Sequence, residues 1–143
     1  MKKGLLIVLF LAACTTGASA QIAVIAHPSV PEKALDTRAL LDIYSLEETK
    51  WDNGSRIVLF DLKGKHDIKQ SFYAFLGRRP EDMKRVWLRI ILTGEAPSPT
   101  ILRTEEEILE QVASTPGSIG YVPLARVTDA VKVLATIQEV PRQ

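Results

Sequence analysis

The chain has few of the residues that carry most catalytic and metal chemistry. Among 143 residues there are one cysteine and two histidines. The cysteine, Cys14, falls within the first twenty residues, so a chain processed after them has no thiol for a disulfide, a Cys-based metal site or a nucleophile. His66-Asp67 is the only place where a histidine is adjacent to an acidic residue, and such a dipeptide is common by chance. We therefore expect no metal site and no cofactor.

The motifs of common enzymes are also missing. No Gly-x-Ser-x-Gly elbow, P-loop or Gly-x-Gly-x-x-Gly loop occurs. Basic and acidic residues nearly balance, at 18 against 17, and loss of Lys2 and Lys3 leaves 16 against 17. A near-neutral chain without a basic stripe is not expected to bind nucleic acid. We predict a protein that is not an enzyme, with no catalytic residues.

The first twenty residues have the parts of a secretory signal peptide. Lys2 and Lys3 form a basic start, and residues 4–13 are apolar but shorter than the about 20 residues that span a bilayer. Ala18-Ser19-Ala20 is an A-x-A cleavage site, which predicts a signal peptide over 1–20 and release into the periplasm. An alternative stays open, because Leu11-Ala12-Ala13-Cys14 fits a lipobox and would make the protein a lipoprotein anchored at Cys14.

Apolar runs alternate with helical patterns along the rest of the chain. The runs at 22–26 and 57–60 predict strands buried on both faces. A predicted helix ending at Tyr44 lies between them, and about thirty residues separate the strands, which favours a right-handed βαβ crossover in a parallel sheet. Further helices are expected near 67–77, 80–91 and 105–114, and further strands at 119–122 and 131–135. The pattern predicts a small three-layer α/β domain with about four mostly parallel strands flanked by helices.

The loop DLKGKHDIKQSF at 61–72 joins the second predicted strand to a helix. As an anion site, it offers Lys63, Gly64, Lys65 and His66 around the helix start, and Gly64 lets the backbone turn closely. As a purely structural feature, it has Asp67 as helix N-cap in a D-x-x-Q capping box. That carboxylate would take the amide groups that an anion needs. Both interpretations stay open.

His27 and Ser29 follow the first predicted strand. Loops at the carboxyl ends of parallel strands line the binding crevice of open α/β sheets. We therefore predict that His27 and Ser29 face one surface together with the loop, although an ordinary turn remains the alternative for His27-Pro28. The predicted anion-binding residues are His27, Ser29, Lys63, Gly64, Lys65 and His66.

Four segments carry a family resemblance through their order and spacing. They are IAVIAHPSVP at 22–31, ALDTRALLDIYSLEETKWDNGSRIVLFDL at 34–62, FYAFLGR at 72–78 and TPGSIGYV at 115–122. Together they resemble the phosphate-type periplasmic substrate-binding proteins of ABC transporters. The resemblance implies that 21–143 is a periplasmic-binding-protein-like domain with the fold of one lobe of a type II protein, whereas family members usually clamp the ligand between two lobes.

The loop departs from the family pattern. The anion loop of the family resembles Arg-x-x-Gly-Ser-Gly-Thr, followed by a phenylalanine that matches Phe72. His66, Asp67 and Ile68 then stand where Ser-Gly-Thr would be, and the arginine position falls on Asp61 or Leu62. The hydroxyls, the flexible glycine and the bidentate cation of the family loop are therefore absent.

The resemblance implies two functions. The first is an exported solute-binding-protein-like domain linked to ABC transport or sensing of phosphate or another small oxyanion. A membrane transporter, a sensor protein or a second copy in a homodimer would then supply the other wall of the site. The alternative is a periplasmic protein–protein interaction module that has lost the anion site. A cationic crevice favours the first function, and an exposed flat apolar face favours the second.

Overall fold

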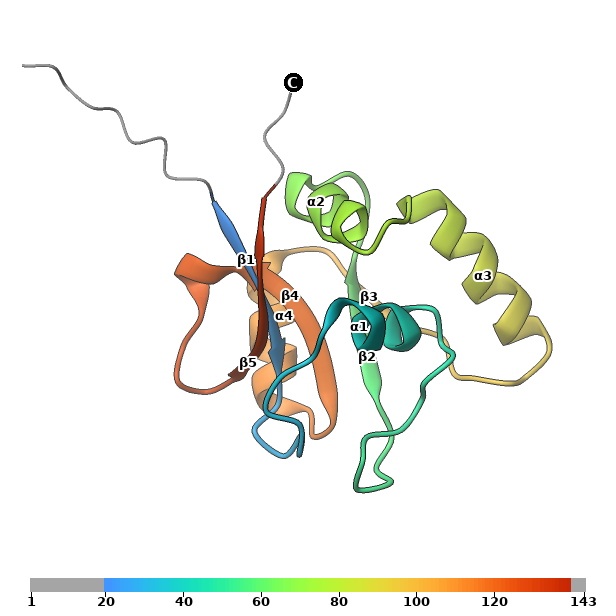
Figure 1. The fold of residues 1–143 in the computed structure, drawn as a ribbon, viewed down its shortest axis with the longest axis horizontal. Helices are drawn as coiled ribbons and strands as arrows, with labels where there is room; N and C mark the ends of the chain where they lie inside the picture. The colour runs from blue at the N-terminus through green and yellow to red at the C-terminus, as the bar shows by residue number, and fades with distance from the viewer. Residues whose placement is uncertain (1–19, 140–143) are drawn as a thin grey trace, which may run out of the picture.

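The computed structural model describes residues 20–139 and forms a sheet with helices on both faces (Figure 1). The predicted signal peptide, apart from Ala20, and the alternative anchor Cys14 lie outside the described residues. Within 20–139 no helix has both the length and the apolar character of a bilayer span. The elements are β1 (Gln21–Ala26), α1 (Thr37–Tyr44), β2 (Val58–Leu62), α2 (Asp67–Phe75), α3 (Pro80–Leu92), β3 (Thr100–Leu102), α4 (Glu105–Ser114), β4 (Ser118–Pro123), the 3₁₀ turn η1 (Leu124–Arg126) and β5 (Lys132–Gln138).

The sheet has five strands in the order β3-β2-β4-β1-β5. β2 runs parallel to β3 and β4, but β1 runs antiparallel to β4 and β5. The predicted α/β class is confirmed, while the sheet is parallel only in part. The predicted crossover from β1 to a parallel β2 is wrong, because β4 lies between them and β1 points the other way. A continuous apolar run reports burial of both faces and does not report strand direction.

Two successive residues of β4 show the three layers. Tyr121 faces α1 and α2, and its ring stacks on Phe72 with centroids 4.2 Å apart and planes 12° apart. Gly120 faces α4, where an added Cβ would lie 2.7 Å from a methyl group of Ile108. Successive side chains of a strand point to opposite faces, so α1 and α2 cover one face and α4 covers the other.

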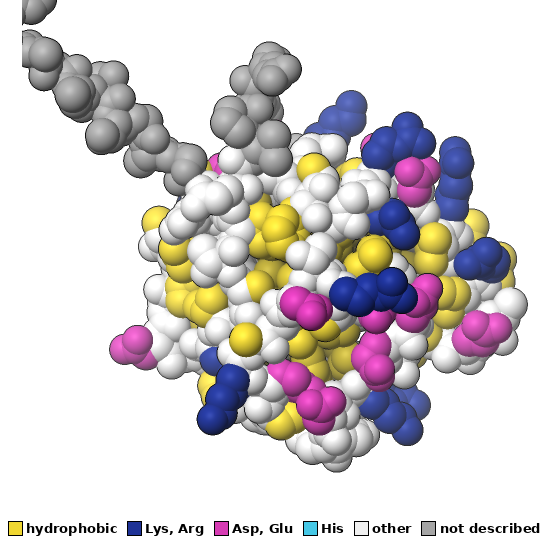
Figure 2. All heavy atoms as spheres, viewed as in Figure 1, with side chains coloured by type: hydrophobic (Ala, Val, Ile, Leu, Met, Phe, Trp, Pro, Cys, Tyr) yellow, Lys and Arg dark blue, Asp and Glu magenta, His cyan; other side chains and the backbone are white. Residues whose placement is uncertain are grey.

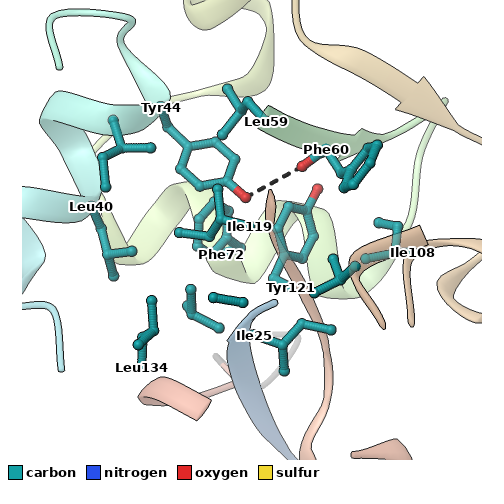
Figure 3. Close-up of a cluster of buried hydrophobic side chains, with 14 of the residues drawn as sticks. Ile25, Leu40, Tyr44, Leu59, Phe60, Phe72, Ile108, Ile119, Tyr121 and Leu134 are labelled. Atoms are coloured by element: carbon teal, nitrogen blue, oxygen red, sulfur yellow. Dashed lines mark hydrogen bonds between the residues drawn. The ribbon is translucent and has the colours of Figure 1, made fainter. Parts of the chain in front are cut away.

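The core on the α1 and α2 side is built around aromatic rings (Figure 3). Tyr44 packs edge-on against Phe72 at 4.7 Å, and its hydroxyl donates to the Phe60 carbonyl at 3.3 Å. Aliphatic side chains from β1 and β5, including Ile25 and Leu134, complete the cluster. Burial of such rings, which bring large apolar area out of water, supplies much of the stabilising free energy of a small domain.

Both tryptophans are buried and use their indole nitrogens in hydrogen bonds. Trp51, under its turn, donates from Nε1 to the Gly117 carbonyl at 2.8 Å, and Trp87 donates to the Tyr44 carbonyl at 2.6 Å. The second bond attaches α3 to the end of α1. The helix expected near 80–91 is present as α3, and its apolar stripe faces inward, with Met83, Trp87 and Ile90 buried and Val86 and Ile91 half-buried.

Candidate functional site

The loop after β2 lies at one end of the sheet. β2 and β4 are parallel, so their carboxyl ends, Leu62 and Pro123, lie at this end, and Pro123 pairs with Ile22 at the start of β1. The Lys63 amide donates to the Leu102 carbonyl at 2.8 Å, which extends the β2–β3 pairing into the loop. Gly64 then turns the chain with φ of 79° and nothing within 4 Å of an added Cβ. The loop is thereby held at its base and open at its tip.

A cavity of about 510 Å³ opens beside this loop. Its walls come from the first residues of β1, the start of α2, the first residue of α4, and the ends of β4 and β5. Lys65 and His66 contribute to the lining, whereas Lys63 and Gly64 do not. The structure therefore brings part of the predicted loop site to a real concavity at the carboxyl ends of β2 and β4, the location expected for a ligand site in an open α/β sheet.

The charge of the cavity is not that of a simple anion site. Asp67, Glu105 and Glu139 line it together with Lys65 and His66. Two of the three carboxylates belong to the first turns of α2 and α4, where the helix dipole favours negative charge. Asp67 and Glu105 therefore already occupy the two helix N-termini that an anion in the cavity would approach.

The cap of α2 differs from the predicted one. The N-cap residue is His66, with extended backbone angles of −107° and 141°, and its side chain makes no capping hydrogen bond. Asp67 is the first residue of the helix, so the predicted D-x-x-Q box with Asp67 as cap is wrong. The helix begins one residue earlier than the predicted capping box requires. His66 keeps extended backbone geometry, and its carbonyl accepts a hydrogen bond from the Gln70 amide at 3.1 Å.

His27 and Ser29 lie at the opposite end of the sheet from the loop. Ala26 at the end of β1 pairs with Ile119 at the start of β4, and Val58 at the start of β2 pairs with Ser118. The prediction that all the candidate residues face one surface is therefore wrong. Its physical reason is the antiparallel direction of β1, which places the carboxyl end of this strand with the amino ends of β2 and β4.

Both residues are engaged in local structure there. The Ser29 amide donates to His27 Nδ1 at 3.0 Å, and the Ser29 hydroxyl lies 2.8 Å from the same nitrogen. The Gly117 amide donates to the Ser29 hydroxyl oxygen at 3.0 Å, and the His27 amide donates to the Ser118 carbonyl. These bonds tie the turn after β1 to the start of β4, in agreement with the ordinary-turn alternative.

A buried ion pair lies beneath the loop. Lys69 on α2 places Nζ 3.2 Å from the Asp61 carboxylate and donates to the Leu62 carbonyl at 2.6 Å. The other Asp61 oxygen accepts the Tyr121 hydroxyl at 2.6 Å. Asp61 is 1% exposed and Lys69 is 3% exposed. The pair is satisfied internally, and it fixes the start of α2 onto the end of β2.

The tyrosines around this pair strongly favour their protonated, neutral forms. Burial, and then the negative charge of Asp61, raise the pKa of Tyr44, Tyr73 and Tyr121 well above the ordinary tyrosine value. All three phenols therefore keep their protons throughout the physiological range. Tyr44 and Tyr121 donate hydrogen bonds in this cluster, whereas Tyr73 contributes by packing its ring against its aromatic neighbours.

The burial of Lys69 could have been predicted from the sequence, although no motif marks it. Lys69 falls three and four residues before the inward-facing Phe72 and Tyr73, so helical spacing places it on the buried face. A buried lysine favours a carboxylate partner, and Asp61 lies next to the last residue of β2, the strand that precedes α2. The remaining cavity acids, Glu105 and Glu139, come from distant segments, and no local pattern predicts their approach.

The Asp61 carboxylate is engaged by both Lys69 and Tyr121. Within residues 20–139 no group of three or more His, Cys, Asp or Glu side chains is arranged to hold a metal ion.

Solved structures of binding proteins share this fold. A protein described as a phosphate ABC transporter substrate-binding protein, from Clostridium perfringens and with bound phosphate, is 22% identical with a TM-score of 0.68, over 80% of this chain and 44% of that chain. An ABC-type phosphate transport receptor from Vibrio cholerae is 16% identical with a TM-score of 0.66, over 80% and 45%. PstS from Borrelia burgdorferi is 15% identical with a TM-score of 0.60, over 81% and 47%.

These likenesses confirm the fold predicted from the resemblance. The chain has the architecture of one lobe of a phosphate-type binding protein and spans less than half the length of the three structures. No protein-family model matches the sequence, and no curated protein matches it either.

Proposed function

We propose that the chain is an exported, non-enzymatic solute-binding-protein-like domain that serves ABC transport or sensing of phosphate or another small oxyanion. One observation carries the proposal. The fold is shared with phosphate transport proteins, one of which is described with bound phosphate, and the cavity of this chain opens at the start of α2 beside Lys65 and His66.

The proposed anion contacts are Lys65, His66, the nearby Lys63, and the amide groups of the turn at Gly64. His27 and Ser29 are not among the proposed anion contacts, because they lie at the other end of the sheet. Three carboxylates share the cavity, so we expect weak affinity in the isolated domain. A membrane transporter, a sensor protein or a second copy of the chain would add the opposite wall and further cations.

Titration calorimetry with inorganic phosphate at low salt tests the proposal. The chain beginning at Gln21 is compared with the triple variant K63A/K65A/H66A and with the matched variant K33A/K50A, whose lysines are exposed and lie outside the cavity. We expect binding heat that the triple variant loses and the matched variant keeps. Absence of binding by the folded chain up to millimolar phosphate would contradict an anion site in the isolated domain.

A second candidate function is favoured by the cavity acids. Asp67 and Glu105 occupy the first turns of both helices that point at the cavity, which supports a protein interaction module that has lost the anion site. The variant D67N/E105Q/E139Q distinguishes the two candidates. If only this variant binds phosphate, carboxylates have replaced the ligand and the second candidate is favoured; equal binding by the wild-type chain favours the first.

The proposed export is tested separately. Mass spectrometry of the protein recovered from a cell envelope fraction should find a mature N-terminus at Gln21. A diacylglycerol-modified Cys14 would instead assign the protein to the lipid-anchored class.

A further inference from the structure

The segment from Arg78 to Leu92, which contains α3, concentrates positive charge in an otherwise acidic domain. It holds five basic residues and two acidic ones, whereas the other described residues hold ten basic and fifteen acidic ones. The segment therefore carries a formal charge of +3 against −5 for the remainder. The overall near-neutral charge conceals this separation. Lys and Arg side chains gather on the side of the molecule where α3 lies (Figure 2).

The outer face of α3 also presents apolar side chains. Leu88 and Leu92 are 59% and 77% exposed, the highest values among the large hydrophobic residues of the described chain. They are one helical turn apart and point away from the inward stripe. Helical spacing places Lys84 on one side of them and Arg85 and Arg89 on the other. We call this set of five residues the α3 ridge.

The cations of the ridge are available for an external partner. Within residues 20–139, Lys84 and Arg89 make no ion pair, and Arg85 lies 4.0 Å from Asp82, which already bonds to Arg79 at 3.0 Å. Lysine and arginine have long aliphatic stems, which can lie along neighbouring leucines while the charged groups stay in water at the edges. The result is an apolar line with positive charge on both sides.

The shape of the ridge indicates the class of partner. Leu88 and Leu92 are the most exposed large hydrophobic side chains among residues 20–139, so they project from the surface as a ridge. A bilayer surface accepts a convex ridge without a matching groove, and its anionic headgroups complement the flanking cations. We propose that the α3 ridge docks the domain on anionic lipid membranes, with Leu88 and Leu92 entering the interface. This inference does not depend on the proposed phosphate site.

Co-sedimentation with lipid vesicles at low ionic strength tests the inference. The probe is vesicles of equal parts phosphatidylglycerol and phosphatidylcholine, compared with phosphatidylcholine alone. The chain begins at Gln21, the first residue of β1, so that the apolar N-terminal segment cannot contribute and every described element is retained. We expect binding only to the anionic vesicles, weakened by added salt.

Two variants with matched controls locate the contact. R85E/R89E should weaken binding by more than about tenfold, whereas K33E/R103E, with the same change in net charge on exposed cations elsewhere, should not. L88S/L92S should weaken it several-fold, whereas I101S, at the exposed Ile101 of β3, should not. Circular dichroism confirms that each variant is folded. Absence of binding to anionic vesicles, or equal losses in the ridge and control variants, would overturn the proposal; a photo-crosslink from position 88 to a protein would then point to a protein partner instead.

Discussion

The two ends of the sheet use similar residues for different purposes. At the end that holds His27 and Ser29, the polar groups form hydrogen bonds within the fold. Gly117, for example, donates its amide to Ser29, and its carbonyl accepts from Trp51 and Val58. At the other end, Lys65 and His66 line an open cavity, and the buried Asp61–Lys69 pair beneath it holds the chain in place. A histidine or serine after a strand is therefore informative only once the direction of the strand is known.

The largest expected effect concerns the pair beneath the open end. Lys69→Met leaves the Asp61 carboxylate buried without its cation, which should lower the free energy of unfolding by about 3–5 kcal/mol. Urea denaturation measures the change. The double variant D61N/K69M removes both charges and should recover most of the loss. A single variant within about 0.5 kcal/mol of wild type would show that the pair does not anchor this end.

Alkaline pH should destabilise the same region. Because the folded chain raises the pKa of Tyr44, Tyr73 and Tyr121, it favours their protonated forms, and the unfolded chain ionises first near pH 10. The stability contribution is full below about pH 10 and is lost as pH rises above it, by about 1.4 kcal/mol per tyrosine for each pH unit until the folded phenols ionise.

Chemical denaturation between pH 9 and 11, within about one unit of the ordinary tyrosine pKa, tests this expectation. Tyr121→Phe should reduce the slope of stability against pH by about a third, since one of three tyrosines no longer titrates. An unchanged slope in this variant would contradict the assignment.

The two ends should respond differently to the loss of a glycine. Gly117 has φ of 74°, and an added Cβ would lie 2.6 Å from the Arg56 carbonyl oxygen. Gly64 has φ of 79° but open space around it. Gly117→Ala should cost about 2–4 kcal/mol of stability through strain and overlap, whereas Gly64→Ala should cost about 1–2 kcal/mol through strain alone. Thermal unfolding of both variants measures the difference, and equal losses would contradict it.

The smallest effect separates structural from exposed polar groups. Ser29→Ala removes the acceptor of the Gly117 amide and should cost about 1 kcal/mol of stability. Lys63→Ala, at the exposed tip of the other end, should change stability by less than about 0.5 kcal/mol. Urea midpoints of the two variants provide the measurement. A larger loss from Lys63→Ala would mean that the loop is more tightly held than its exposure indicates.

Local patterns in the sequence predicted the elements well and their arrangement less well. The helices expected near 80–91 and 105–114 are present as α3 and α4, because helical periodicity is a local property of the sequence. The direction of β1 was not predictable from its apolar run, since pairing with β4 and β5 is decided by contacts about a hundred residues away in the chain. The resemblance supplied the correct lobe fold although it did not supply this pairing.

The site divides in the same way. Lys65 and His66 were found because they lie in one loop next to a helix start. Glu105 and Glu139 were missed because only the folded sheet brings them to the cavity. Lys69 was predictable in principle, because its helical spacing from Phe72 and Tyr73 places it on the inner face of α2.

The edge pairing of β1 with β5 has a mechanical consequence. Gln21 lies opposite Gln138, and the Glu139 amide donates to the Ala20 carbonyl at 2.8 Å, so the chain enters and leaves the domain side by side. A pulling force applied between these two points acts across the strands and not along them. It would open the ladder one hydrogen bond at a time, like a zipper, and the domain should yield at far lower force than a fold whose pulled strands must slide past each other.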